Sequence, residues 1–387
     1  MRAHKKMKIL VINSGSSSVK YQLFNTQDSR SLCKGIVDRI GSNRANIIHS
    51  NDGNKNYTKK INAHDHHAAI KHIFDILVSA EYGAIGSWSD ISAIGHRIVH
   101  GAEVFRKPTL MDKKVIKSIE KFNELAPLHN PPAVLSVKAC LKFAQNIPQV
   151  AVFDTAFHQT IPPYAYIYGI PYKFYKKYKI RRYGFHGTSH KFVASQAARL
   201  LEKPLSRLNL ITCHLGNGCS ITAVKKGRSI DTSMGFTPLE GLLMGTRSGD
   251  IDPAAVLYIM EKEKISVKDA DDLLNKRSGM LGLSGVSNDM RDILKQVRLG
   301  NKRAKLALDI FIYRIRKYIG AYAASMDSLD AVVLTGGIGE NSDIIKRRIS
   351  KEMSGFLRRF RAKLLVIPTN EELMIAKETA EIIKKKR

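Results

Sequence analysis

KILVINSGSSSVKYQLF, Lys8 to Phe24, reads as a strand, a glycine- and serine-rich turn and a second strand. An apolar, β-branched run precedes the turn, and apolar residues alternate with polar ones after it. Gly15 permits a turn with positive φ, and the amides and hydroxyls of such a turn, with Lys20 beside it, suit an anion. A plain polar hairpin turn is the alternative, and the combination with Asn13 favours a phosphate site.

The same plan recurs half a chain later in NLITCHLGNGCSITAVKKGRSIDTSMGF, residues 209–236. Its strand, small polar turn and alternating strand indicate a duplicated domain. A third strand with a glycine-rich end, DAVVLTGGIGENS at residues 330–342, leads into a helix whose first amides suit a phosphate. These patterns predict an α/β protein in two halves.

The composition is that of an ordinary globular protein, with 44% hydrophobic and 25% charged residues in 387, a length that allows two domains. No apolar run approaches the ~20 residues that span a bilayer. The four cysteines form no CxxC pair, so the sequence indicates neither zinc nor a disulfide framework and favours a reducing cytoplasm. The cluster HDHH, His64 to His67, is interpreted as a solvated surface.

The net charge of +29, from 63 Lys and Arg against 34 Asp and Glu, is high for a soluble enzyme. Such a charge is typical of proteins that bind nucleic acid or an anionic surface. The basic residues are spread along the chain apart from the terminal KKKR, which favours a basic proteome or an anionic substrate over a nucleic-acid partner.

Local capping patterns predict two helix starts. Asn130, followed by two prolines, predicts a helix with Asn130 at its cap. Thr369 and Glu372 fit a capping box at the start of the last helix, which leaves Glu371 without a capping role. A further strand ends on Asp154, where α/β folds often place catalytic groups, and a structural cap is the alternative there.

Eight segments resemble, in chain order, the motifs of the acetate kinase family: NSGSSSVKYQLF, GHRIVHGAE, FDTAFHQT, RRYGFHGTSH, HLGNGCSITA, GLLMGTRSGDIDP, TGGIGENS and IPTNEEL. The resemblance runs nearly from end to end, and MGTRSGDIDP with GFHGTSH is its most specific part. The departures are few: Ala102 stands where the family usually has a second glycine, and the first domain is slightly short.

The resemblance implies a duplicated ribonuclease H-like fold of the actin, hexokinase and heat-shock ATPase superfamily, with two domains around a nucleotide cleft. The expected domains are residues 1–155 and 156–371, and the terminal helix, 372–387, is expected to pack back on the first. The implied reaction is ATP + acetate ⇌ ADP + acetyl phosphate with Mg²⁺, or Mn²⁺ in its place. A cytoplasmic homodimer is implied as well.

Phosphoryl transfer to a carboxylate needs cations more than a strong base, because the acceptor is already ionised. Arg97 and Arg247 lie in glycine-flanked loops, where a guanidinium fork can hold an oxyanion, although most single arginines are surface charges. By resemblance, Arg97 binds acetate, whereas Asp154, His186 and Arg247 are catalytic. A core histidine is the alternative for His186.

The resemblance assigns the magnesium ion to Asn13 and Glu371. Each of them alone could equally be a turn residue or a helix-start acid favoured by the helix dipole. Nucleotide contacts are also implied, with a structural role as the alternative for His214 and a surface loop for residues 289–291. These nucleotide residues are Lys20, His214, Leu215, Gly216, Asn217, Gly218, Asp289, Met290, Arg291, Gly337, Ile338, Gly339, Glu340 and Asn341.

Two other functions are compatible with the sequence. A propionate or other short-chain acyl kinase is one, because a methylene changes discrimination by only ~1–3 kcal/mol. Val99 and Pro238 are the candidates for the acyl pocket. A nucleic-acid-binding protein on a degenerate kinase scaffold would explain the charge, but the chain has no recognised nucleic-acid motif and keeps every charged kinase motif residue.

Overall fold

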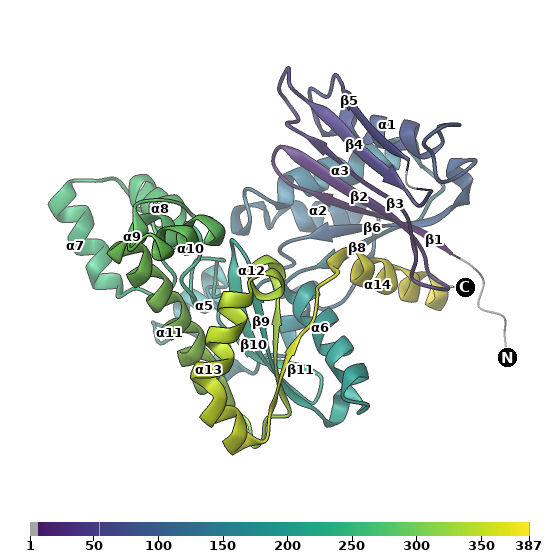
Figure 1. Cartoon of the computed structure of the whole chain (residues 1–387). Helices are drawn as coiled ribbons and strands as arrows, with labels where there is room; N and C mark the ends of the chain where they lie inside the picture. The colour runs from purple at the N-terminus through teal and green to yellow at the C-terminus, as the bar shows by residue number, and fades with distance from the viewer. Residues whose placement is uncertain (1–6, 54, 387) are drawn as a thin grey trace. The chain divides into compact units, whose positions relative to one another are not determined.

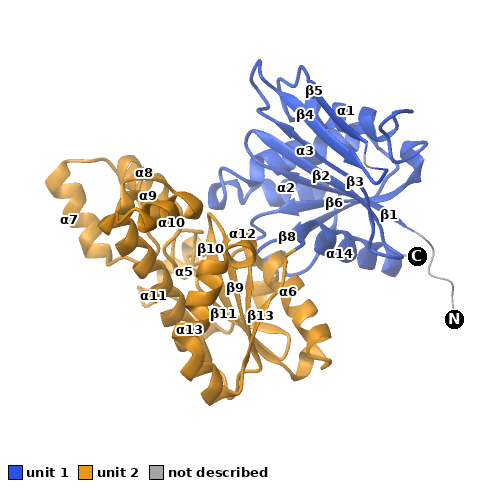
Figure 2. Cartoon of the chain, in the orientation of Figure 1, with its two compact units in different colours: residues 1–156, 370–387 blue, residues 157–369 orange. Residues whose placement is uncertain are grey.

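The computed structural model describes residues 7–53 and 55–386. The chain forms two compact units, one made of residues 1–156 and 370–387 and the other of residues 157–369 (Figure 2). The C-terminal segment therefore belongs with the N-terminal part of the chain, here called unit 1, and the middle of the chain forms unit 2.

Unit 1 is built on a sheet whose strand order is β5-β4-β3-β2-β1-β6-β8-β7 (Figure 1). The first five strands along the chain form antiparallel pairs, whereas β1, β6 and β8 run parallel. The strands are β1 (Lys8–Ser14), β2 (Ser18–Asn25), β3 (Ser31–Asp38), β4 (Asn46–Asn51), β5 (Asn56–Lys60), β6 (Ile91–Ile98), β7 (Thr109–Leu110) and β8 (Gln149–Phe153).

Unit 2 has a smaller sheet with the order β11-β10-β9-β12-β13. Its strands are β9 (Asn209–Leu215), β10 (Cys219–Lys225), β11 (Arg228–Thr232), β12 (Ala331–Thr335) and β13 (Lys363–Val366). Three antiparallel strands are followed by two parallel ones, as in β3-β2-β1-β6-β8 of unit 1. The prediction of a duplicated α/β fold is confirmed by this repeated topology.

Strand β1 shows how the sequence buries both faces of the first sheet. Leu10 and Ile12 pack with helices α1 (His66–Leu77) and α3 (Asn130–Phe143), while Ile9 packs against α14 (Glu371–Lys386) on the other face. This is the two-residue period of a strand covered on both sides, and each such buried side chain contributes about 1.5–3 kcal/mol. Helix α2 (Lys113–Glu120) packs against α3.

The two units exchange a helix. In unit 2, α6 (Gly187–Leu200) follows β8 along the chain but packs against β9 and β12. Helix α14 follows β13 but packs against β1, β6 and β8 of unit 1. The remaining helices of unit 2 are α4 (Pro163–Tyr166), α5 (Lys173–Tyr178), α7 (Pro253–Glu263), α8 (Val267–Lys276), α9 (Gly279–Ser284), α10 (Met290–Arg298), α11 (Lys302–Ala324), α12 (Gly336–Asn341) and α13 (Asp343–Phe360).

Both predicted caps were wrong. Asn130 is the first residue of α3 and its side chain bonds to the backbone of His100 instead, accepting from the amide at 3.1 Å and donating to the carbonyl at 3.0 Å. Helix α14 is capped by Asn370, whose Oδ1 accepts from the Leu373 amide at 2.8 Å. In each case the side chain predicted to cap the helix bonds elsewhere in the fold: Asn130 to His100, and Thr369 Oγ1 to Ser189 Oγ at 2.8 Å.

The histidine cluster is not the uniformly solvated surface that the sequence predicted. His66 is buried and its Nε2 lies 2.8 Å from the carbonyl oxygen of Gly15, in the turn between β1 and β2. His64 is exposed, as expected for a surface. The first helix thus holds the glycine- and serine-rich turn in place from behind.

Buried histidines predict a loss of stability in acid. His96 of β6 is fully buried, with Nε2 2.8 Å from Gln149 Oε1, and burial lowers its pKa to about 4. Between about pH 6.5 and pH 4 the unfolded chain therefore binds a proton that the folded chain does not, so stability falls as pH falls through this window. The full effect is on the order of 3 kcal/mol.

The measurement is urea unfolding at pH 7.5, 5.5 and 4.5 for the wild type and His96→Gln. Glu371 acts in the opposite direction, because burial raises the pKa of its carboxyl to about 7. The comparison of the two proteins removes this common contribution. We expect a shallower acid loss in His96→Gln, and equal pH dependence of the two proteins would contradict the assignment.

Candidate active site

Arg97 and Asp154 lie side by side at one edge of the first sheet. Strands β6 and β8 are parallel neighbours, with Arg97 opposite Val152, so the end of β8 brings Asp154 next to the guanidinium. Arg97 donates from Nε to Asp154 Oδ2 at 3.0 Å, and Nη2 forms a short ion pair with the same oxygen. Asp154 is almost completely buried, so this carboxylate orients the arginine.

Two further predicted residues surround the same guanidinium. Asn13, near the end of β1, places Oδ1 3.4 Å from Arg97 Nη1, and Glu371, in the first turn of α14, places Oε2 3.8 Å from Arg97 Nε. These groups come from the ends of three parallel strands and the start of a helix. Asn13, Arg97, Asp154 and Glu371 are here called the arginine cluster.

The arginine cluster sets one guanidinium against two carboxyl groups, Asp154 and Glu371. Burial raises the pKa of Glu371 to about 7, against the opposing attraction of Arg97, and Asp154 and Glu372 add to the rise. Burial works to lower the pKa of Arg97, but Asp154 and Glu371 outweigh it, so the pKa lies above its ordinary value. The guanidinium is therefore permanently charged, and the surrounding oxygens are suited to a second cation.

His186 stands at the start of α6 in a strained backbone conformation, with φ of 57°. Its Nδ1 lies 2.9 Å from Ser220 Oγ on β10, and its ring centroid lies 4.3 Å from that of His214. His214 in turn places Nδ1 2.8 Å from Ser189 Oγ. A strained residue held by its surroundings is typical of a functional site.

The phosphate turn, residues 216–218 between β9 and β10, brings His186 and Arg247 together. The amide of Gly216 donates to the carbonyl of Gly218 at 3.1 Å and closes the turn. A Cβ atom on Gly218 would lie 3.4 Å from Arg247 Nη1 and 3.6 Å from His186 Nε2. Two nitrogen donors thus converge on one bare backbone position, which suits a group with negative oxygens.

The loop that carries Arg247 is fastened to this turn. The Gly245 amide donates to the Asn217 carbonyl at 2.9 Å, and the Asn217 side chain accepts from Asn288 Nδ2 at 3.1 Å. At the base of the loop, Gly241 and Asp250 are joined through the Asp250 amide and the Gly241 carbonyl at 3.0 Å. These hydrogen bonds hold the loop, and with it Arg247, in position.

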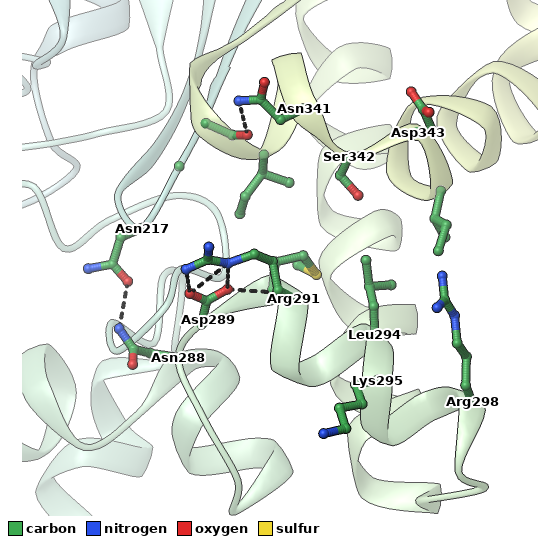
Figure 3. Close-up of a pocket in the computed structure, with 15 residues that line it drawn as sticks. Asn217, Asn288, Asp289, Arg291, Leu294, Lys295, Arg298, Asn341, Ser342 and Asp343 are labelled. Atoms are coloured by element: carbon green, nitrogen blue, oxygen red, sulfur yellow. Dashed lines mark hydrogen bonds and ion pairs between the residues drawn. The ribbon is translucent and has the colours of Figure 1, made fainter.

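A pocket of about 850 Å³ opens beside the phosphate turn (Figure 3). Helix α10 forms one wall and the start of α12 and α13 another. Asp289 caps α10 and is paired with Arg291, whose Nε lies 3.0 Å from Oδ1, and this pairing lowers the pKa of Asp289 to about 2. The volume and the adjoining turn fit a nucleotide with its phosphates toward residues 216–218.

The structure brings most of the predicted nucleotide residues to this pocket. Its lining includes Gly216, Asn217, Asp289, Met290, Arg291, Gly337, Ile338 and Asn341. Gly218 stands between His186 and Arg247, and Lys20 lies on β2 in unit 1, opposite Asn13 in the strand register. Leu215, Gly339 and Glu340 are outside the lining, and Glu340 Oε1 instead accepts from the Gly336 amide at 2.7 Å and the Thr369 amide at 3.0 Å.

Sequence reasoning missed part of the site. The unpredicted lining residues are Asn288, Leu294, Lys295, Arg298, Ser342, Asp343 and Ile344. Leu294, Lys295 and Arg298 follow Arg291 at helical spacing, so the period of α10 was the signal that could have found them. Ser189 and Ser220, which hold the histidines, carry no comparable signal in the sequence.

Comparison with known proteins decides the family. The model of the acetokinase family matches residues 8–357. The chain belongs to the acetokinase family. It is 51% identical to the acetate kinase of Halothermothrix orenii, over 97% of this chain and 100% of that one, and 52% identical to the acetate kinase of Caldicellulosiruptor saccharolyticus, over 98% and 100%.

Solved structures of the acetokinase type agree. The crystal structure of Porphyromonas gingivalis acetate kinase matches with a TM-score of 0.92 at 40% identity, covering 97% of this chain and 100% of that one. A propionate kinase from Francisella tularensis matches with a TM-score of 0.89 at 42% identity, covering 97% and 99%. Within residues 7–53 and 55–386, no helix is both long and apolar enough to cross a membrane.

In this acetokinase, Gly218→Ala is expected to abolish most activity without unfolding the protein. The added methyl group would meet Arg247 and His186 at 3.4 Å or more, which is ordinary contact, but it would occupy the space between the two donors. We expect kcat to fall by about 10²-fold, comparable to the loss of one transition-state donor. The measurement is steady-state kinetics beside a melting curve. Gly169→Ala, where a Cβ meets nothing within 4 Å, is the control, and near-normal kcat in Gly218→Ala would contradict the prediction.

Proposed function

We propose that this chain catalyses reversible phosphoryl transfer between ATP and the carboxylate of acetate, giving ADP and acetyl phosphate. The observation that carries the proposal is the convergence of His186 and Arg247 on the bare turn at Gly218, next to a pocket of nucleotide size. The resemblance of the chain to acetate kinases over nearly its whole length supports the same reaction.

The arginine cluster is proposed to hold the acceptor. Asp154 fixes one side of the Arg97 guanidinium, so the remaining N–H groups form a pre-oriented fork for a carboxylate. Acetate is ionised at neutral pH and needs no general base, but it must be held against an anionic phosphate. A fixed cation lowers that repulsion and positions the attacking oxygen.

The two donors of unit 2, Arg247 and His186, are proposed to stabilise the phosphoryl group during its transfer. Its charge spreads over three equatorial oxygens in the transition state, where preoriented donors have their largest effect. Arg247 supplies a full charge and His186 an N–H group, both near Gly218. The amides of the phosphate turn and the glycines at the start of α12 would hold the nucleotide phosphates.

The residues of the arginine cluster fit a hydrated magnesium ion. Glu371 is a buried carboxylate beside other carboxylates, and its pKa is raised first by burial, with Asp154 and Glu372 adding to the rise against the attraction of Arg97. In the part of the chain that the structure describes, no group of three or more His, Cys, Asp or Glu could chelate a metal directly. Mg²⁺ keeps most of its waters, so Asn13 and Glu371 suffice to hold it, with Mn²⁺ as a substitute. When bound, the ion would neutralise phosphate charge.

Glu371→Ala is expected to raise the magnesium requirement more than the acetate KM. The carboxylate contacts Arg97 at 3.8 Å only, so its loss leaves the Asp154 pairing in place. The measurement is a magnesium titration of the initial rate at saturating ATP and acetate. Glu372→Ala, at the next position, is the control for the change of charge. An unchanged magnesium titration in Glu371→Ala would remove this residue from the metal site.

A substrate panel tests the proposal against the short-chain acyl alternative. The Francisella neighbour is named a propionate kinase, and Val99 and Pro238 are the candidates for the acyl pocket. Hydroxylamine traps any acyl phosphate, so kcat/KM can be compared for acetate, propionate and butyrate at fixed ATP. We expect acetate to lead, within the ~10–200-fold range of one methylene. A higher value for propionate would replace acetate as the substrate, and no trapped product from any acid would overturn the kinase proposal.

We further propose that the enzyme is a cytoplasmic homodimer and that nucleic acid is not a partner. The dimer and the compartment are what the family resemblance implies, and sedimentation equilibrium tests the first. The net charge of +29 motivates the nucleic-acid alternative. Binding to duplex DNA that is steep in salt, in a protein that forms no acetyl phosphate, would favour that alternative.

A further inference from the structure

A chain of hydrogen bonds leads from β9 to the back of His186. Thr212 Oγ1 lies 2.8 Å from His190 Nδ1, His190 Nε2 lies 2.7 Å from Ser220 Oγ, and Ser220 Oγ lies 2.9 Å from His186 Nδ1. Thr212, His190 and Ser220 are all fully buried. No water is needed to connect them, and each link joins one side chain directly to the next.

The hydroxyl of Thr212 sets the direction of this chain. Among the described residues, His190 Nδ1 is the one hydrogen-bond partner of Thr212 Oγ1. If Nδ1 donated to Thr212, the threonine hydrogen would be buried without an acceptor, which is costly and rare. The hydroxyl hydrogen therefore points to Nδ1, and Nδ1 of His190 carries no hydrogen.

His190 accepts a hydrogen bond from Thr212 and donates one to Ser220, so the hydrogen bonds keep the same donor-to-acceptor direction. Burial, with His158 and His214 adding to it, lowers the pKa of His190 well below its ordinary value, so the ring is neutral and has one N–H group. With Nδ1 as the acceptor, this hydrogen lies on Nε2 and is donated to Ser220 Oγ. The Ser220 hydrogen is then donated to its other partner, Nδ1 of His186.

We propose that Thr212, His190 and Ser220 form a one-way hydrogen-bond relay that fixes His186 as the tautomer with its hydrogen on Nε2. The ring edge that carries this nitrogen faces Gly218, with Cε1 3.5 Å and Nε2 3.6 Å from the position of a Cβ there. With Nδ1 accepting from Ser220, His186 thus presents a donor, not a lone pair, toward the phosphoryl oxygens. This consequence rests on the proposed function, whereas the tautomer itself does not.

The relay orients the His186 ring among other titratable or charged groups. The titratable or charged groups near it include His214 from β9, whose ring packs against it, His190 through Ser220, and Arg247 on the other side of Gly218. The relay supplies orientation without adding a second cation beside Arg247. Thr212, His190 and Ser220 are positioning residues in this scheme, since they act through His186.

The direct test is nuclear magnetic resonance of the full chain labelled with ¹⁵N-histidine. Two-bond couplings from the ring carbon-bound hydrogens to the nitrogens tell protonated from unprotonated nitrogens, and His186→Gln and His190→Gln assign the signals. We expect both His186 and His190 to carry their hydrogen on Nε2 at pH 7.5. A hydrogen on Nδ1 of either ring would overturn the relay.

Two variants connect the tautomer to activity. Ser220→Ala removes the link to His186, and Thr212→Val removes the hydroxyl that sets the direction while keeping the β-branched shape that suits a strand. We expect mixed tautomers at His186 in both variants and a loss in kcat of about tenfold, the effect of one ordered hydrogen bond, with KM values nearly unchanged. Thr222→Val is the matched control, because Thr222 pairs with Thr232 at 2.8 Å outside the relay.

The results of these experiments distinguish a failure of the relay from a failure of the proposed function. If Ser220→Ala fails to fold, Thr212→Val carries the test, because its signals and rates are read in the same way. An unchanged His186 tautomer in a folded Thr212→Val would overturn the relay. A wild type that shows the expected tautomers but forms no acetyl phosphate would support the relay and contradict the proposed function.

Discussion

Arg247→Ala is expected to lower kcat by about 10²–10³-fold, with KM values for ATP and acetate little changed and no loss of melting temperature. The physical reason is that Arg247 is partly buried and has no ion-pair partner among the described residues. Burial lowers the pKa of its guanidinium, and Nη1 makes long hydrogen bonds, to Pro238 O at 3.5 Å and Met244 Sδ at 3.8 Å. Among the described residues, no carboxylate forms an ion pair with it. A partly buried guanidinium such as that of Arg247, without an ion-pair partner, is suited to bind an anionic ligand.

The controls for Arg247 distinguish charge from shape. Arg247→Lys should recover only part of the rate, since a point charge cannot replace a planar fork. His186→Ala should cost less than Arg247→Ala, because the histidine contributes a hydrogen bond without a full charge. Arg277→Ala, an exposed arginine that donates to the Asp269 carbonyl at 3.0 Å, should change neither kcat nor melting temperature. A near-normal kcat in Arg247→Ala, or a loss explained by unfolding, would defeat the catalytic assignment.

Arg97→Leu is expected to raise the acetate KM by roughly 10–100-fold, the value of a charged hydrogen bond, and to destabilise unit 1 as well. Arg97 differs from Arg247 because it is paired, to Asp154 and Glu371. Removing it leaves these carboxylates buried without their partner, which costs about 3–5 kcal/mol. The ATP KM should change much less, because the nucleotide pocket is lined by residues of unit 2.

A double variant separates the two effects of Arg97. Arg97→Leu with Asp154→Asn removes one of the two carboxylates left without a partner, so the melting temperature should recover in part relative to Arg97→Leu alone. The acetate KM should stay high, because the cation that holds the acceptor is still missing. The measurements are acetate and ATP saturation curves beside thermal melts of both variants. Normal acetate saturation in Arg97→Leu would show that this arginine does not bind the acceptor.

The sequence patterns predicted the duplicated α/β plan because each half begins with a strand–turn–strand segment. Residues 8–24 and 209–236 became β1–β2 and β9–β10, which occupy equivalent places in the two strand orders. Their periods depend only on burial of each face, so they are visible in a single sequence. The helix exchange of α6 and α14 has no local pattern, and only the family resemblance pointed to the return of the terminal helix.

The parts that the sequence missed depend on tertiary partners. Asn130 and Thr369 have side chains that can cap a helix, but they form hydrogen bonds with His100 and Ser189 instead. Ala102 shows the reverse case, in which a departure from the family acquires a physical meaning: its φ of 48° lies in the left-handed region that favours glycine. Hydrogen-bond direction, as in the relay behind His186, requires distances that no motif contains.

The measurement that tests the central claim most directly is ³¹P nuclear magnetic resonance of the wild type with ATP, Mg²⁺ and acetate labelled with ¹⁸O in both carboxylate oxygens. Direct attack of the carboxylate on the γ-phosphorus predicts equal amounts of ADP and acetyl phosphate, with the isotope shift of an ¹⁸O bound to phosphorus. Formation of AMP and pyrophosphate, or release of inorganic phosphate without acetyl phosphate, would contradict the account.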